Sequence, residues 1–256
     1  MKYKIAVCML AFDNGVRIDR AIERFYAETD LPSEIEIDFY LFALGYPIPT
    51  PETNYLELQM LASKHNVNLC VMENQGQDGN IIQVHKMLAS QAHDAIVFYD
   101  ADTRPNKRSW LTDALDVMAH DDKCGFVTIN CSRTDNALCQ QTEHLDVSGV
   151  KCAKLIWPGG WPMLMFASRF SWQHFNKTFS YYGGTEGNIL DALNKSQMHG
   201  YMLREHDDLQ DLDDRDGEYL AWKHYAIVKP VARLIQKKAS SYIPLSFLPL
   251  TPIESW

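Results

Sequence analysis

The chain lacks the features that mark membrane-spanning and nucleic-acid-binding proteins. None of its apolar runs reaches the roughly 18 residues that are needed to cross a bilayer. It has 24 Lys and Arg against 33 Asp and Glu, and the formal net charge of −9 disfavours general binding to nucleic acid or to an anionic membrane. These absences favour an ordinary globular chain.

Cysteines are few, and their spacing is not that of a structural site. The six cysteines form no CxxC pair and no zinc-like pattern with histidine, and several stand in apolar runs. We therefore expect reduced thiols and a cytoplasmic location. The first residues, MKYKIAVCMLAFDN, resemble a signal peptide only superficially, because the apolar stretch is short and runs directly into Asp13.

Two common nucleotide-binding motifs are also missing. The chain has no GxxxxGK[ST] sequence, which disfavours a P-loop NTPase, and no GxGxxG after the first apolar run, which disfavours a dinucleotide-binding fold. What is present is 256 residues of ordinary composition, 46% of them hydrophobic, which is enough for one large core. We expect a single domain over residues 1–228, followed by an arm over residues 229–256.

Short apolar runs alternate with amphipathic stretches along the first half. Strands are expected at 4–12, 35–44, 67–74, 95–100 and 126–132. Helices are expected after Asp13 or Asn14, around 55–62, at 81–92, and from Pro105 and Asn106 through the apolar face that includes Trp110 and Met118. This alternation predicts an α/β sandwich of Rossmann type, with a mostly parallel central sheet and helices on both faces.

The apolar run AIVFY is followed by two carboxylates, Asp100 and Asp102, with one residue between them. Ligands of parallel sheets bind beyond the carboxyl ends of the strands, so this pair should lie near Asp13 and the loop 74–80. Two carboxylates held close together repel each other unless a cation lies between them. Hard oxygen ligands on a short turn suit Mg²⁺ or Mn²⁺, which fills its remaining positions with water and phosphate oxygens. The sequence therefore predicts group transfer from a nucleotide diphosphate, and the alternative is an ordinary helix N-cap with a surface acid.

The stretch NQGQDGNIIQVHKMLASQAHDAIVFYDADTRPNKRSWLTDAL (74–115) resembles the nucleotide-sugar half of GT-A fold glycosyltransferases of the family 2-like group. In that family an Asn-x-Gly loop leads into a helix, and the next strand ends in a DxD motif that is followed by Pro and a Trp-bearing helix. The resemblance implies a GT-A-like sandwich with a nucleotide-sugar-binding half (1–132) and an acceptor-side half (133–228).

The resemblance also assigns roles on the donor side. Asp102 would bind the metal directly, and Asp100 would act through water or contact the ribose. Residues that border the base and ribose would be Ala11, Phe12, Asp13, Asn74 and Gly76. A UDP-sugar is the donor that the family implies, although the second strand ends LFALGYP where family members usually carry an Asp that holds the base.

Aromatic residues and glycines gather in the acceptor-side half. Flat aromatic faces stack on sugars as well as on core neighbours, and the candidates here are Trp157, Trp161, Tyr181 and Tyr182, the last two followed by the turn Gly183-Gly184. Glu186 stands where inverting members of the resembling family carry an acidic pair that includes the general base. It could take that role or be a first-turn acid that favours the helix dipole, and without a base a retaining mechanism is open.

The stretch 204–224 is dense in acids but does not fit the EF-hand pattern. We expect a solvated loop that can close over a donor. The resembling family commonly supplies a histidine metal ligand from this side of the chain, with His206, expected directly after a strand, as first choice and His224 as second. A structural histidine is the alternative.

The chain is therefore expected to be a metal-dependent glycosyltransferase with Mn²⁺ or Mg²⁺ as cofactor and an unidentified acceptor. A sugar-nucleotide-forming nucleotidyltransferase stays open, although AFDNGVRIDR is a poor version of its Gly-rich loop, and so does a non-catalytic nucleotide-sugar-binding protein. A nucleic-acid acceptor would need a local basic rim from Arg104, Lys107 and Arg108. The arm 229–256 could pack on the domain, lie on a membrane or mediate self-association.

Overall fold

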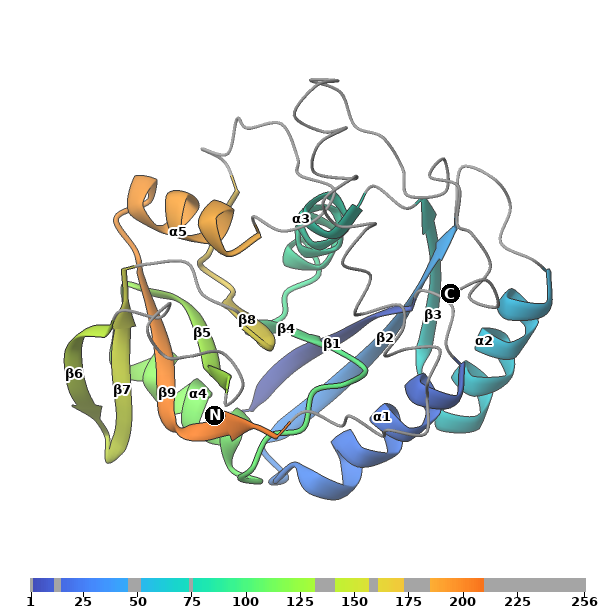
Figure 1. Cartoon of the computed structure of the whole chain (residues 1–256), viewed down its shortest axis with the longest axis horizontal. Helices are drawn as coiled ribbons and strands as arrows, with labels where there is room; N and C mark the ends of the chain where they lie inside the picture. The colour runs from blue at the N-terminus through green and yellow to red at the C-terminus, as the bar shows by residue number, and fades with distance from the viewer. Residues whose placement is uncertain are drawn as a thin grey trace, which may run out of the picture.

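The computed structural model describes residues 2–11, 15–45, 52–73, 76–131, 141–156, 161–172 and 185–209. Nine strands of this part form one sheet (Figure 1). They are β1 (Tyr3–Ala11), β2 (Ile35–Gly45), β3 (Asn68–Glu73), β4 (Ala95–Tyr99), β5 (Cys124–Cys131), β6 (Gln141–Val147), β7 (Val150–Leu155), β8 (Met163–Ala167) and β9 (His199–Asp208). The helices are α1 (Gly15–Glu28), α2 (Glu52–His65), α3 (Gly76–Ala89), α4 (Trp110–His120) and α5 (Thr185–Lys195). None of these helices is long and apolar enough to cross a membrane.

The strand order is β3-β2-β1-β4-β8-β5-β9-β7-β6. From β3 to β4 every pairing is parallel, as the alternation of apolar runs and helices predicts. Beyond β4, four of the five pairings among the described strands are antiparallel, and only β5–β9 is parallel. The expected α/β sandwich is therefore confirmed, but the expectation of a mostly parallel sheet holds only for the β3–β4 part.

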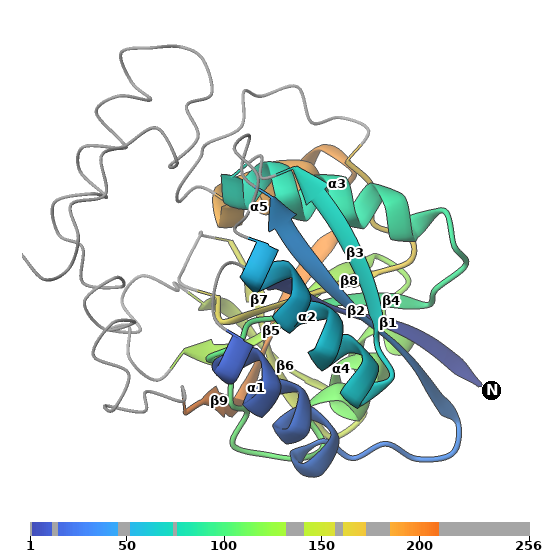
Figure 2. The ribbon, with the colours of Figure 1, turned by 90° about the vertical axis from the view of Figure 1, so that its right-hand side faces the viewer.

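Helices cover both faces of the sheet, and on each face an apolar cluster lies between the sheet and its helices. In Figure 2, α1, α2 and α4 lie on one side of the sheet, and α3 and α5 lie on the other. The first cluster includes the predicted face of α1, with Ile18, Ile22 and Phe25 fully or almost fully buried. The second is built from α3, α5 and the opposite side chains of the strands. Burial on both faces explains why the central strands read as continuous apolar runs.

Two helix boundaries differ from the sequence-based expectation. Helix α3 begins at Gly76 and ends at Ala89 rather than spanning 81–92. It stops there because the N–H of Gln91 bonds the carbonyl of Leu88 at 2.9 Å and Ala92 takes a left-handed φ of 56°. Helix α4 begins at Trp110 and not at Pro105.

Candidate active site

The two predicted metal ligands lie in a turn at the carboxyl end of β4, in the middle of the sheet. All five residues of β4 are buried between its neighbours β1 and β8. The chain then turns, and the N–H of Thr103 donates to the carbonyl of Asp100 at 3.0 Å. The side chain of Asp100 is exposed and that of Asp102 is half-buried. The buried strand β4 thus places two carboxylates at the carboxyl ends of the parallel strands, which is where ligands of α/β proteins bind.

Neither carboxylate caps α4, the helix that follows them. Helix α4 begins eight residues after Asp102, and its N-cap residue is Ser109. The reading of this motif as an ordinary N-cap is therefore wrong.

The segment between the turn and α4 is held extended by the end of β9. The N–H of Arg104 donates to the Asp208 carboxylate at 2.7 Å, and the N–H of Leu209 donates to the carbonyl of Arg104 at 2.8 Å. The N–H of Asn106 donates to the carbonyl of Asp207 at 2.8 Å. These bonds join residues about a hundred positions apart, and they explain why the helix does not start at Pro105.

His206 lies inside β9, two residues before its end, and not after the strand as expected. Only 2% of the residue is exposed. Its Nε2 lies 2.7 Å from Oδ2 of Asp113 on α4, and its Nδ1 is buried with no partner among the described residues. Burial lowers the pKa of His206 despite the opposing effect of Asp113, so the ring is neutral at pH 7. We assign the ring proton to Nε2, because a carboxylate can only accept, which leaves a lone pair on Nδ1.

The basic residues that follow the acidic pair form no free basic rim. Each is paired with a carboxylate, and the pairs are Arg104–Glu28 at 3.2 Å, Lys107–Glu205 at 3.0 Å and Arg108–Asp30 at 2.9 Å. Lys151 also binds Glu205, and the two lysines lower the pKa of this carboxyl to about 2. The local positive charge that a nucleic-acid acceptor would need is therefore largely neutralised.

The structure also describes Ala11, Gly76, Glu186 and Trp161, and of these Gly76 lies in a helix rather than in the expected loop. Ala11 is the last residue of β1 and is buried beside Ala43 of β2. Gly76 begins α3, and Glu186 is a half-buried acid in the first turn of α5. Trp161 is only 7% exposed, and its ring packs on Phe126 with 5.0 Å between centroids, so most of its surface serves the core.

Several predicted site residues fall outside the described part of the chain. On the donor and metal side they are Phe12, Asp13, Asn74 and His224, and on the acceptor side they are Trp157, Tyr181, Tyr182, Gly183 and Gly184. The arm 229–256 also lies outside it.

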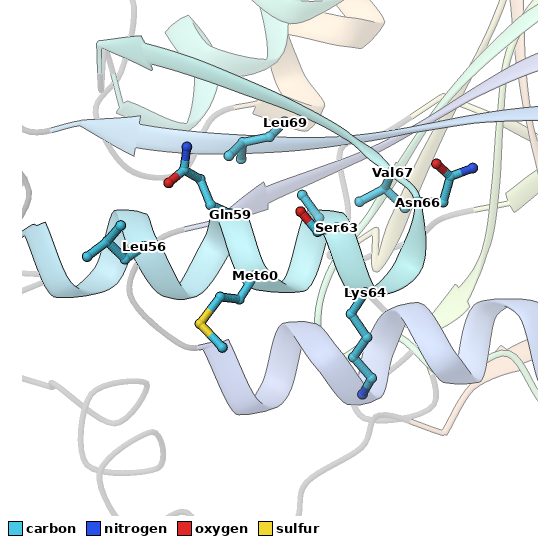
Figure 3. Close-up of a pocket in the computed structure, with 9 residues that line it drawn as sticks. Leu56, Gln59, Met60, Ser63, Lys64, Asn66, Val67 and Leu69 are labelled. Carbon is cyan, nitrogen blue, oxygen red and sulfur yellow. The ribbon is translucent and has the colours of Figure 1, made fainter.

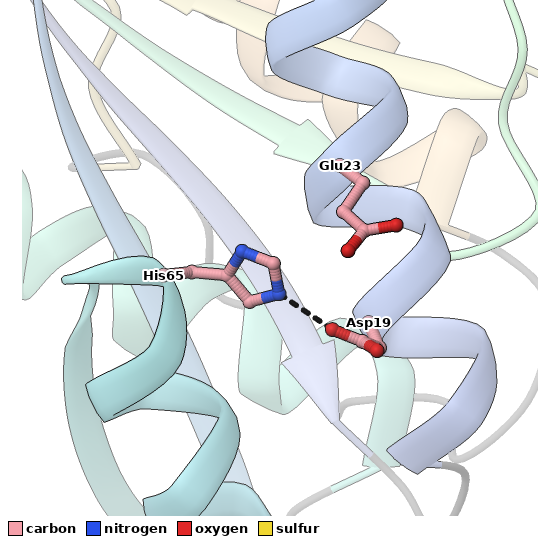
Figure 4. A group of neighbouring side chains, drawn as sticks. All are labelled: Asp19, Glu23 and His65. Carbon is pink, nitrogen blue, oxygen red and sulfur yellow. Dashed lines mark hydrogen bonds and ion pairs between the residues drawn. The ribbon is translucent and has the colours of Figure 1, made fainter.

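A second group of possible metal ligands lies between α1 and α2, where Asp19, Glu23 and His65 approach one another (Figure 4). His65 Nε2 lies 2.5 Å from Oδ1 of Asp19. The ammonium of Lys64 lies 2.7 Å from Asp19 and 2.9 Å from Glu23. Because the ammonium of Lys64 already neutralises both carboxylates, we interpret this group as an ion-paired contact between α1 and α2.

A pocket of about 980 Å³ opens between α2 and the edge strand β3 (Figure 3). Its lining combines apolar and polar side chains, among them Met60, Lys64 and Leu69. Asn66 and Val67, which also line it, precede β3, so the pocket reaches the amino end of that strand. It is therefore distinct from the carboxyl edge that carries Asp100 and Asp102.

No protein-family model and no curated protein sequence matches the chain. Solved structures do. A mannosyltransferase from Pyrobaculum calidifontis, solved with GDP-Man and Mn²⁺, matches with a TM-score of 0.59 at 16% identity, over 97% of this chain and 68% of that one. GalNAc-T7, solved with UDP, GalNAc and Mn²⁺, matches with a TM-score of 0.57 at 9% identity, over 80% of this chain and 43% of that one.

A nucleotidyltransferase also matches. The CMP-2-keto-3-deoxy-manno-octonic acid synthetase, solved with CTP, has a TM-score of 0.52 at 8% identity, over 91% of this chain and 99% of that one. At these identities the likeness concerns the fold. The chain has a GT-A-type fold, as the resemblance in the sequence implied.

Proposed function

We propose that the chain is a metal-dependent glycosyltransferase that moves a sugar from a nucleotide-diphosphate donor, a UDP-sugar by expectation, to an acceptor hydroxyl. One observation carries the proposal. A carboxylate pair follows a fully buried central strand at the carboxyl end of a GT-A-type sheet, and the helix that follows, α4, is capped by Ser109 and not by this pair. The pair lies where ligands of α/β proteins bind, and a cation that bridges to a diphosphate needs such oxygens.

By type, the proposed side chains suit Mn²⁺ or Mg²⁺, and the metal would have to draw them together, because the group that already lies within 4.8 Å among the described residues is Asp19, Glu23 and His65. Asp102 and Asp100 would offer hard carboxylate oxygens. His206 has its Nδ1 buried without a partner in the described chain, while its Nε2 is bonded to Asp113. That is the arrangement of a metal-binding histidine whose second nitrogen is held by a carboxylate, and it supports His206 as the third ligand. The bound ion would supply stabilisation of the charge that develops on the departing diphosphate.

The remaining roles follow the same proposal. Ala11, Phe12, Asp13, Asn74 and Gly76 would border the nucleoside. Trp157, Tyr181 and Tyr182, with the Gly183-Gly184 turn, would form the acceptor side, and Trp161 would support them from the core. Glu186, if it acts as general base, would take the proton of the acceptor hydroxyl. Cys8, Cys70, Cys124 and Cys152 carry free thiols, which supports the proposed cytoplasmic location.

A second candidate is a nucleotidyltransferase that joins a nucleoside triphosphate to a sugar and releases pyrophosphate. The similarity to the CTP-bound synthetase favours it, because that match covers almost the whole of the other chain. The products separate the two candidates. A glycosyltransferase consumes a nucleotide sugar and releases a nucleoside diphosphate, whereas a nucleotidyltransferase consumes a triphosphate.

The first test is turnover of a panel of labelled nucleotide sugars with water as acceptor, with Mn²⁺ and with a chelator. We expect release of nucleoside diphosphate only with the metal, and a loss of about a hundredfold in Asp102→Asn. Asp122→Asn is the control, because it removes the same charge from a fully exposed side chain in the turn after α4. Unchanged turnover in Asp102→Asn contradicts the proposal.

A further inference from the structure

Thr103, the residue after Asp102, is fully buried and is bonded on every polar atom. Its carbonyl accepts two hydrogen bonds, from the hydroxyl of Tyr99 at 3.0 Å and from Nη1 of Arg24 on α1 at 3.1 Å. With the N–H that closes the turn onto Asp100, the backbone of Thr103 is fixed from three directions.

The side chain of Thr103 provides a fourth connection. Its Oγ1 donates to the carbonyl of Pro162 at 2.9 Å. Pro162 directly precedes β8 and belongs to the acceptor-side half of the chain. The hydroxyl therefore ties the acidic turn to the segment that enters β8, across 59 positions of sequence.

We propose that Thr103 is a positioning residue that holds the carboxylates of Asp100 and Asp102 in place for the metal and in register with the acceptor-side segment at Pro162. The role rests on the proposed function. A metal site gains affinity when its ligands are held before binding, and outer-shell hydrogen bonds provide that restraint. The Thr103 hydroxyl is the polar side-chain group next to Asp102 in the chain, and it donates its hydrogen bond to the carbonyl of Pro162.

The fold offers a matched control in Thr128 of β5. Thr128 is also fully buried, and its hydroxyl donates at 2.6 Å to the carbonyl of Met163, the residue after Pro162. Valine at either position keeps the volume of the side chain and leaves a buried carbonyl without that donor. The two substitutions therefore cost the fold a similar interaction, but only one of them touches the acidic turn.

The test compares Thr103→Val, Thr103→Ser and Thr128→Val with the wild-type chain. Electron paramagnetic resonance of free Mn²⁺ measures the metal affinity, with UDP or GDP present, and thermal unfolding measures stability. We expect Thr103→Val to raise the Kd for Mn²⁺ by about tenfold or more, while Thr128→Val and Thr103→Ser stay within about twofold of wild type. Both valine variants should lose similar thermal stability.

If Thr103→Val does not fold, Tyr99→Phe is measured in its place. It removes one of the two donors to the Thr103 carbonyl, and we expect it to weaken Mn²⁺ binding by about threefold while Thr128→Val does not. Equal Mn²⁺ affinities in wild type, Thr103→Val and Tyr99→Phe, or an equal loss in Thr128→Val, would overturn the positioning role. Absence of Mn²⁺ binding by the wild type is a different result, because it overturns the proposed function itself and this role with it.

Discussion

At the scale of single residues, His85 shows how burial fixes a protonation state. It lies on α3 with 2% of its surface exposed, and its ring packs edge-on against Phe166, Phe170 and Trp172 at centroid distances of 4.9, 5.4 and 6.1 Å. Burial lowers its pKa to about 4, and the neighbouring charge of Lys86 acts in the same direction. The folded chain therefore keeps this ring neutral where the unfolded chain protonates it.

This difference predicts a loss of stability in acid. The contribution of His85 is fully present above its unfolded pKa of about 6.5 and is lost as the pH falls toward 4, because only the unfolded state takes up the proton in that range. Between pH 7 and pH 4 the wild type should lose about 3 kcal/mol more unfolding free energy than His85→Leu. Urea unfolding at the two pH values measures both losses. Equal losses would show that His85 does not carry the effect.

Sequence patterns located the acidic pair but not the residues that hold it. The run AIVFYDADT predicts a strand that ends on two acids, because apolar burial and turn formation are local properties. The roles of Thr103, Asp113 and Asp208 depend on partners 59 to 104 positions away, and no local pattern encodes such pairs. A buried threonine beside a DxD motif is a signal only once the fold is known.

At the scale of elements, β9 and α4 together hold the candidate metal-binding histidine. Asp113 in the first turn of α4 accepts from both His206 and the hydroxyl of Ser109, which lies 2.9 Å away. The ring orientation of His206 thus depends on the helix that follows the acidic turn. If His206 is a metal ligand, Asp113 sets the position and basicity of its free nitrogen.

Asp113→Asn should therefore weaken Mn²⁺ binding by about tenfold, because an amide cannot hold the histidine as a carboxylate does. Asp116→Asn, three residues further along the same helix and exposed, should leave the affinity near that of wild type. Isothermal titration with Mn²⁺ measures both variants. If Asp113→Asn lowers only the melting temperature and not the affinity, His206 is a structural residue and not a ligand.

The elements that sequence reasoning anticipated are those whose stabilising contacts are local. The parallel strands β1 to β5 and the helices between them follow the alternation of apolar runs and amphipathic stretches. The start of α4 was misplaced because long-range bonds from Asp207 and Asp208 keep residues 104–106 extended. The insertion of β8 between β4 and β5 was not anticipated, since it depends on pairing between segments distant in sequence. The β6–β7 hairpin is local, and it was not anticipated either.

At the scale of the whole molecule, the central strands bring the two halves of the chain to one edge. Strand β4 and its acidic turn come from the first half, while β8 and β9 on the far side of β4 come from the second. Hydrogen bonds from Thr103 and Arg104 cross this boundary. A donor held by the first half would therefore lie beside groups supplied by the second, as transfer between two substrates requires.

The most direct test of this account is the thermodynamic coupling between Mn²⁺ and a nucleoside diphosphate. Melting temperatures are measured for the wild type and Asp102→Asn with UDP or GDP alone, with Mn²⁺ alone and with both. An ion that bridges protein and diphosphate makes each ligand strengthen the binding of the other. We predict that the shift with both exceeds the sum of the separate shifts in the wild type, and that Asp102→Asn abolishes the excess. Additive shifts in the wild type, or an excess that survives in Asp102→Asn, would contradict a metal held between Asp102 and a nucleotide.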